Sequence, residues 1–160
     1  MIPVEEVEAI LKRLVAENPT GFAIGLHVSF TTSKFLFQTY RRDWMEEYSR
    51  RGLIMHDPTV RWGLTNEGAV RWSELAEADE ADVFGAARAH GLAHGVTIAL
   101  EKEGTRSIGS FARSDREFDA AEIERFRSAI ERMHELTTDA TMEDEAESRL
   151  RRLAISSTHS

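Results

Sequence analysis

Three aromatic residues recur at intervals of four positions, and an aspartate follows them a short distance later. Tyr40, Trp44 and Tyr48 are followed by Asp57. If residues 41–51 form a helix, Trp44 and Tyr48 lie on one face. Tyr40 then stands at the helix entrance. An indole N–H and a phenol hydroxyl each add one directed hydrogen bond to an apolar ring. A face of this kind can bury a small amphipathic molecule and also fix its orientation.

The same residues also have ordinary structural interpretations. Aromatic residues at helical spacing are more often part of a hydrophobic core than of a ligand cage. Asp57 precedes Pro58, and this pair is typical of a helix start, since aspartate caps backbone N–H groups and proline suits the first helical position. Asp57 can be both a cap and a ligand acceptor only if one carboxylate oxygen is free. The spacing alone leaves both interpretations open.

No arrangement in the sequence indicates catalysis. Ser110 has Ile108 and Ala112 at the two positions where a nucleophile elbow has glycines. Neither a phosphate-binding loop nor a dinucleotide-binding motif follows a predicted strand. His90 and His94 are four residues apart, but Gly91 lies between them and no acidic third ligand is evident nearby. We therefore expect a protein that is not an enzyme and that carries no metal and no cofactor.

Length and composition restrict the class of protein. A chain of 160 residues without cysteine is expected to form one domain with a sizeable core and no disulfide. The net charge of -8 argues against nucleic acid or an anionic membrane as the main partner. The acidic N-terminus does not resemble a signal peptide, and no apolar run is long enough to span a membrane. These features predict a soluble cytoplasmic protein.

The hydrophobic pattern predicts two strand pairs with helices between and around them. Apolar residues recur at helical spacing from Val4 to Val15, and the expected strands are short alternating segments bounded by turn residues. We expect helices over 4–15, 41–51, 79–90 and 118–136, a helical stretch that begins at Pro58, and strands over 22–30, 34–40, 69–72, 95–102 and 106–113. Strand pairs interrupted by helices predict an α+β fold in which an antiparallel sheet lies between helical layers.

The sequence changes character near its end. Residues from Thr137 onward are polar and contain no second hydrophobic core. We expect a globular domain over 1–138 and a polar C-terminal tail over 139–160, which is helical in part over 142–153.

Several short motifs, taken together and in order, resemble a known family. They are Tyr40, Trp44 and Tyr48, then Asp57-Pro58-Thr59-Val60, then Trp72-Ser73, then Gly91-Leu92 with Gly95-Val96-Thr97-Ile98, and then the run from Gly109 to Ser114. Each motif alone is weak, whereas the set in this order and spacing is specific. It resembles the autoinducer-binding domain of LuxR-type quorum-sensing transcriptional regulators, from about Gly21 to Leu136. The resemblance implies a PAS/GAF-like α-β-α sandwich that encloses an N-acyl homoserine lactone between the sheet and one helical layer.

The resemblance also implies roles for polar residues in the ligand site. Trp44 would donate to the lactone carbonyl, Asp57 would accept the amide N–H, and Tyr40 would donate to the acyl carbonyl. Ser110 is the candidate for a second hydroxyl donor on the last strand, although the register could instead place Ala112 there. A buried amide needs one donor and one acceptor, and these side chains supply both. The walls around the lactone ring would be formed by Tyr48, Trp72 and Phe84, with Thr59 nearby.

The acyl chain requires only an apolar wall, where each added methylene that fits gains about 0.8 kcal/mol. The candidates for this wall are Leu26, Val28, Phe30, Leu36, Val60 and Ile108. Alternation places the first three of these on one face of the first predicted strand. Gln38 shares a face of the second predicted strand with Leu36 and Tyr40. It would therefore shorten the tail pocket or contact a substituent near the acyl carbonyl.

The chain departs from the family pattern after the last predicted helix. Full-length members continue into a helix-turn-helix domain that binds DNA, and no basic recognition helix follows here. The chain is either an excised ligand-binding domain or a natural stand-alone one, and we expect no direct DNA binding and no membrane association. The expected function is that of a lactone sensor that forms a homodimer. The alternative is a ligand-independent module that forms a heterodimer with a full-length LuxR-type regulator and modulates it.

Overall fold

The structure is a computed structural model that describes residues 3–30 and 32–138. Within these ranges, five antiparallel strands form one sheet in the spatial order β2-β1-β5-β4-β3. The strands are β1 (Phe22–Ser29), β2 (Thr32–Gln38), β3 (Gly68–Arg71), β4 (His94–Lys102) and β5 (Thr105–Arg113). The α+β class predicted from the interrupted strand pairs is confirmed. The predicted tail over 139–160 lies outside the described residues.

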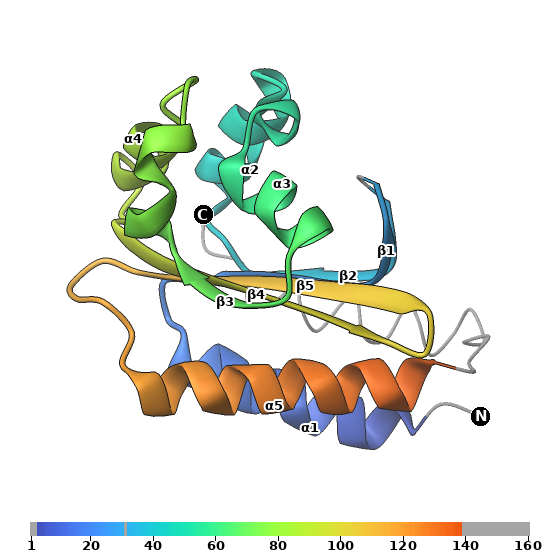
Figure 1. Ribbon diagram of the computed structural model, residues 1–160. Coiled ribbons are helices and arrows are strands. Elements are labelled where there is room, and N and C mark those ends of the chain that lie inside the picture. Colours follow the sequence, from blue (N-terminus) through green and yellow to red (C-terminus); the bar gives the residue numbers. More distant parts are fainter. Residues whose placement is uncertain (1–2, 31, 139–160) are drawn as a thin grey trace.

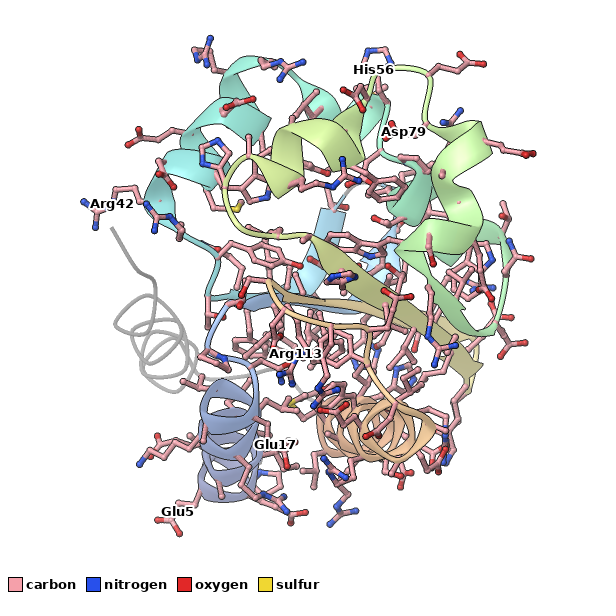
Figure 2. The ribbon with its side chains drawn as sticks, turned by 90° about the vertical axis from the view of Figure 1, so that its left-hand side faces the viewer. Glu5, Glu17, Arg42, His56, Asp79 and Arg113 are labelled. Carbon is pink, nitrogen blue, oxygen red and sulfur yellow. The ribbon has the colours of Figure 1, made fainter. Side chains whose placement is uncertain are left out.

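Helices cover both faces of this sheet (Figure 1). One face carries α1 (Val4–Glu17) and α5 (Ala120–Thr137), which lie side by side. The other face carries α2 (Arg42–Arg50), α3 (Pro58–Thr65) and α4 (Val83–Arg88), together with short 3-10 segments at Leu53–Met55 and Trp72–Ala78. The perpendicular view in Figure 2 shows the same two helical layers on opposite sides of the sheet.

Each helical layer packs on the sheet through its own buried cluster in the described part of the chain. The larger cluster joins α1 and α5 to the sheet and includes Leu11, Phe22, Phe126 and Ile130. Such a continuous cluster is the usual core of a domain of this size. The second cluster lies on the opposite face and contains Tyr40, Trp44, Leu53, Trp72, Val83, Ala87, Leu92 and Ala112. Residues predicted for ligand binding therefore contribute to the second cluster.

Helix α5 begins with a reciprocal pair of caps. The Asp119 carboxylate accepts the backbone N–H of Glu122 at 2.8 Å, and the Glu122 carboxylate accepts the N–H of Asp119 at 2.9 Å. This capping box satisfies two backbone donors that have no partner within the helix. The Arg116 guanidinium, which is hydrogen-bonded to Glu122, lowers the pKa of that carboxyl to about 2. The helix starts two residues after the predicted position, at Ala120.

The segment before β4 differs most from the prediction. A helix was expected over 79–90, but α4 spans only Val83–Arg88. The Asp79 carboxylate accepts the N–H groups of Val83 and Phe84, both at 2.8 Å, and Asp82 has a positive φ of 54°. These features place a turn before the helix, because a left-handed residue interrupts the helical backbone. Trp72, predicted as the last residue of a strand, instead begins a 3-10 segment.

A β-bulge in β1 changes which side chains face the helices of the second layer. Between Gly25 and Val28, β1 advances three residues while its partner β5 advances two. His27 has a φ of 55° at this irregularity. Leu26 is fully buried in the cluster under α1 and α5. The prediction that Leu26 shares a face with Val28 and Phe30 is therefore wrong, because the extra residue shifts the alternation by one position.

A hydrogen-bonded network joins the bulge to the last turn of α5. The His27 Nε2 atom lies 2.8 Å from the Thr137 hydroxyl, which donates to the Met133 carbonyl oxygen at 2.8 Å. The Nε2 atom must therefore carry the proton, and the Nδ1 atom accepts from the Thr105 hydroxyl at 2.8 Å. The ring is thus satisfied in its neutral form. Burial, followed by the neighbouring His134 ring, lowers the pKa of His27 to about 4.

Acidification is expected to weaken the fold through His27. Its folded pKa of about 4 lies below the ordinary value of 6.5, so the unfolded chain binds more protons between these values. The free energy of unfolding should therefore decrease as the pH falls through this window. His27→Asn retains a residue type that tolerates a positive φ and removes the titrating ring. Urea unfolding at about pH 7 and about pH 5 should show a smaller loss of stability in this variant.

The matched control is His56→Asn. His56 is exposed, and Figure 2 shows it at the outer edge of the opposite helical layer. This variant should keep the pH dependence of the wild type. Equal pH dependence in the two variants would contradict the assignment to His27.

Candidate ligand-binding site

A cavity of about 220 Å³ lies between the sheet and the layer that contains α2, α3 and α4. All of the predicted site residues except Leu26 line it, namely Tyr40, Trp44, Tyr48, Asp57, Thr59, Val60, Trp72, Phe84, Ser110, Val28, Leu36, Gln38 and Ile108. Phe30, also predicted for the acyl wall, lines the cavity as well. The fold thus brings together residues from strands β1, β2 and β5 and from every element of the second helical layer.

Asp57 is the N-cap of α3, and both of its carboxylate oxygens accept hydrogen bonds. Oδ1 accepts the backbone N–H of Thr59 at 2.9 Å and the Thr59 hydroxyl at 2.8 Å. Oδ2 accepts the Tyr48 hydroxyl at 2.8 Å. The residue is 8% exposed, and burial raises the pKa of Asp57. Because a carboxylate oxygen can accept two hydrogen bonds, Oδ2 retains the capacity for a second donor. Neither oxygen is free, as the sequence interpretation had required, but this remaining capacity of Oδ2 makes an acceptor role compatible with the capping role.

Two tyrosines at the site, of which Tyr40 is buried and Tyr48 half-buried, already donate hydrogen bonds within the protein. Tyr48 donates to Asp57, and Tyr40 donates to the backbone oxygen of Ser110 at 3.1 Å. Burial and, to a smaller extent, the Asp57 carboxylate raise the pKa of both phenols. Both hydroxyls therefore stay protonated at neutral pH. Tyr40 can donate to another acceptor only by leaving Ser110.

Trp44 is the aromatic residue of α2 that lies deepest, with 4% of its surface exposed. Its ring meets the edge of Tyr48 at a centroid distance of 5.6 Å, and the His90 ring lies 5.5 Å away. In the ranges that the structure describes, no acceptor is hydrogen-bonded to its indole N–H. An indole N–H at the wall of a largely apolar cavity is a donor suited to a ligand carbonyl.

A relay of three side chains orients the hydroxyl of Ser110. The Trp72 indole N–H donates to the Thr97 hydroxyl oxygen at 3.1 Å, and that oxygen lies 2.7 Å from Ser110 Oγ. Thr97 is fully buried, and Ser110 is the acceptor available to its hydroxyl proton among the described residues. A buried hydroxyl without an acceptor is costly, so Thr97 donates to Ser110. The Ser110 proton is then available to the cavity.

The register of β5 decides between Ser110 and Ala112. Thr97 of β4 pairs with Ser110, and Gly95 pairs with Ala112. Ala112 is fully buried in the second cluster and does not line the cavity. The hydroxyl therefore lies at the cavity wall, in agreement with the first of the two registers considered.

Several lining residues escaped the sequence interpretation. They are Ala23, Gly25, Thr32, Ser33, Met45, Ile54, Val83 and Ala87. A signal for the first two exists in β1, where small residues at 23 and 25 alternate with large apolar residues at 22, 24 and 26. This alternation indicates that large side chains fill one face of β1 and that small residues leave space beside the other face.

The histidine pair considered for a metal site is divided between different partners. His90 lies 2.9 Å from the Glu47 carboxylate, and His94 lies 3.3 Å from the Glu117 carboxylate. Over residues 3–30 and 32–138, no group of three His, Cys, Asp or Glu side chains is arranged to hold a metal ion.

No helix in these ranges combines the length and apolar character needed to cross a bilayer.

Comparison with known sequences identifies relatives of the chain. A family model described as the autoinducer binding domain matches residues 20–138. The transcriptional activator protein SolR of Ralstonia nicotianae is 32% identical over 104 residues, which are 62% of this chain and 44% of SolR. The transcriptional activator protein VanR of Vibrio anguillarum is 28% identical over 109 residues, which are 66% of this chain and 45% of VanR. These matched segments span less than half the length of the two relatives.

Solved structures share the fold at lower sequence identity. The LuxR family transcription factor CepR2 of Burkholderia cenocepacia aligns with a TM-score of 0.59 at 19% identity, over 81% of this chain and 79% of CepR2. SdiA of Escherichia coli aligns with a TM-score of 0.62 at 23% identity, over 97% of this chain and 65% of SdiA. A further SdiA structure, in complex with octanoyl-rac-glycerol, aligns with a TM-score of 0.55 at 23% identity, over 99% and 72% of the chains.

The family match covers most of the chain, and the cavity lies between the sheet and helices that the matched residues form. The sequence relatives are named as transcriptional activators, in agreement with the prediction that this chain is not an enzyme. The chain belongs to the family of autoinducer-binding domains.

Proposed function

We propose that this chain is a sensor that binds an N-acyl homoserine lactone in the cavity beneath α2, α3 and α4. The observation that carries the proposal is the position of a buried acceptor, Asp57, beside two donors, Trp44 and Ser110, in a largely apolar cavity. An acylated amide offers one N–H donor and carbonyl acceptors, so its polar groups match these side chains. CepR2 is described as N-acylhomoserine lactone dependent, and SdiA has been solved with octanoyl-rac-glycerol. Both descriptions favour an acylated ligand here.

Each polar group of the lactone has a proposed partner. Trp44 donates to the lactone carbonyl, and Oδ2 of Asp57 accepts the amide N–H beside Tyr48. Ser110 donates to the acyl carbonyl, because its proton is available, whereas Tyr40 would first have to break its hydrogen bond to the protein. The stacked rings of Trp72 and Phe84, whose centroids are 5.4 Å apart, form the proposed wall beside the lactone ring. The wall of the acyl chain includes Val28, Leu36, Val60 and Ile108, with Gln38 and Thr59 as polar neighbours.

Trp44→Phe tests the first of these hydrogen bonds. Phenylalanine preserves an aromatic ring but removes the indole donor, and a typical hydrogen bond contributes about 0.5–1.5 kcal/mol. We expect lactone affinity to fall about 2- to 12-fold while the unliganded protein stays folded. In the wild type, lactone at about 100 times its Kd should raise the free energy of unfolding by about 2.7 kcal/mol. Calorimetric titration and thermal unfolding with and without lactone measure both quantities.

Trp62→Phe is the matched control, because Trp62 is a half-buried residue of α3 that does not line the cavity. Its lactone affinity should equal that of the wild type. If lactones of no acyl length stabilise the wild type, the proposed function is wrong. In that case, co-purification with a full-length LuxR-type regulator in the absence of ligand would favour the heterodimerisation module.

A further inference from the structure

The cavity has a buried polar end and an exposed apolar end. At the polar end, Trp44 and Asp57 are 4% and 8% exposed. At the other end, Leu36 and Phe30 also line the cavity, but they are 54% and 83% exposed. Ile54, in the 3-10 segment after α2, also lines the cavity and is 36% exposed. The cavity is therefore not closed by a buried wall where the strand hairpin meets the helical layer.

The exposed end is built on the hairpin of β1 and β2. Figure 1 shows this hairpin rising from the sheet on the side that carries α2 and α3, and β2 is an edge strand. The bulge at His27 brings Val28 to the cavity side. Gly25 of β1 pairs with Leu36 of β2. Because glycine has no side chain, position 25 adds no bulk beside Leu36. Val28, Phe30 and Leu36 thus extend the lining of the cavity onto the hairpin, where Thr32 and Ser33 also line it.

We infer that this apolar strip, formed by Val28, Phe30, Leu36 and Ile54, binds the distal part of an acyl chain that is longer than the enclosed cavity. The inference rests on the proposed function and adds the ligand class, a lactone with a long acyl chain whose end stays partly exposed. A tail that covers the strip removes apolar surface of both partners from water. A closed cavity would instead reject chains beyond a fixed length, because overpacking strains the surrounding side chains.

Exposure alone does not define the strip. Met55 is 70% exposed and adjoins Ile54 in sequence, yet it does not line the cavity. A second copy of the chain is another possible cover for exposed apolar side chains. The acyl tail is favoured because all four strip residues are also part of the cavity lining, so a ligand anchored at Asp57 meets them along one surface.

The first test is the dependence of Kd on acyl length in the wild type. Hexanoyl, decanoyl and tetradecanoyl homoserine lactone are titrated below the concentrations at which they self-associate. A fully buried methylene tightens binding about fourfold, and a half-exposed one about twofold. The two ligands differ by four methylenes, so we expect tetradecanoyl lactone to bind about 16-fold more tightly than decanoyl lactone. Weaker binding of the tetradecanoyl ligand would show that the cavity is closed and would overturn the inference.

The second test is the double variant Phe30→Ser with Leu36→Ser, compared with Met55→Ser. The double variant should bind tetradecanoyl lactone about tenfold more weakly while its affinity for hexanoyl lactone changes by less than about twofold. Met55→Ser should leave both affinities unchanged. The inference would be overturned if the double variant weakened binding of both ligands equally or of neither. It would also be overturned if the double variant lost self-association of the protein without any effect on lactone binding. If hexanoyl lactone fails to bind the wild type while longer chains bind, both the proposed function and the inference are supported. If no lactone binds, both fail.

Discussion

Asp57→Asn is expected to abolish most of the stabilisation by lactone while the unliganded protein remains folded. Asparagine retains an oxygen that can accept the Thr59 N–H, so the cap of α3 is preserved. It replaces the oxygen next to Tyr48 with an amide donor, which would face the proposed amide N–H of the ligand. Hydrogen bonds to charged groups contribute about 1.5–3 kcal/mol. Lactone affinity should therefore fall roughly 10- to 100-fold in calorimetric titration.

Asp119→Asn provides the matched control for this variant. Asp119 is also an aspartate N-cap and accepts the backbone N–H of Glu122 at 2.8 Å, but it begins α5 on the opposite side of the sheet. Both variants should lose little stability in urea unfolding, because asparagine is a good N-cap. Only Asp57→Asn should lose lactone affinity. Unchanged affinity in both variants would mean that Asp57 is a helix cap and nothing more.

Gly95→Ala is expected to disrupt the wall of the cavity and to destabilise the fold. The Trp72 indole lies so close to Gly95 that a Cβ atom at this position would overlap the ring. Trp72 is 9% exposed and is stacked on Phe84, so the ring has little room to move. Its displacement would also break the hydrogen bond to Thr97 that orients Ser110. Overpacking of a well-packed site costs about 1–3 kcal/mol, and we expect lactone binding to be lost together with this stability.

Gly52→Ala is the control that distinguishes steric overlap of the new Cβ atom from the general effect of replacing a glycine. Gly52 has a φ of 60°, and a Cβ atom there meets no other atom within 4 Å. Alanine should cost about 1–2 kcal/mol from backbone strain alone, without weakening lactone binding. Urea unfolding and calorimetric titration of both variants measure these effects. The role assigned to Gly95 would be refuted if Gly95→Ala bound lactone as tightly as Gly52→Ala.

The positions of most site residues could be predicted because they depend on residue patterns within short segments of the chain. The four-residue spacing of Trp44 and Tyr48 places both on the same side of a helix regardless of what packs against it. Asp57 caps α3 through Thr59, only two residues away. Such contacts between near neighbours depend on the backbone conformation of a short segment, which its own residue types largely favour.

Other features depend on contacts between distant residues. The relay from Trp72 through Thr97 to Ser110 depends on the register of β4 on β5. The sequence alone does not give this register, so it left Ala112 as an alternative to Ser110. Leu26 was placed on the wrong face because strict alternation was assumed through β1. The bulge that changes its face is held by bonds from His27 to Ser107 and Thr137, 80 and 110 residues away.

By itself, the sequence determined the α+β class, the aromatic face of α2 and the aspartate at the start of α3. Residue type and spacing suffice for these features, since each depends on the hydrophobic pattern or on a local cap. Only the tertiary structure decided which residues enclose the cavity and that its apolar end, at Phe30 and Leu36, is exposed. Strand register, the bulge and the distance between the hairpin and the helical layer are set by contacts between segments far apart in the chain, and periodicity within one segment does not encode them.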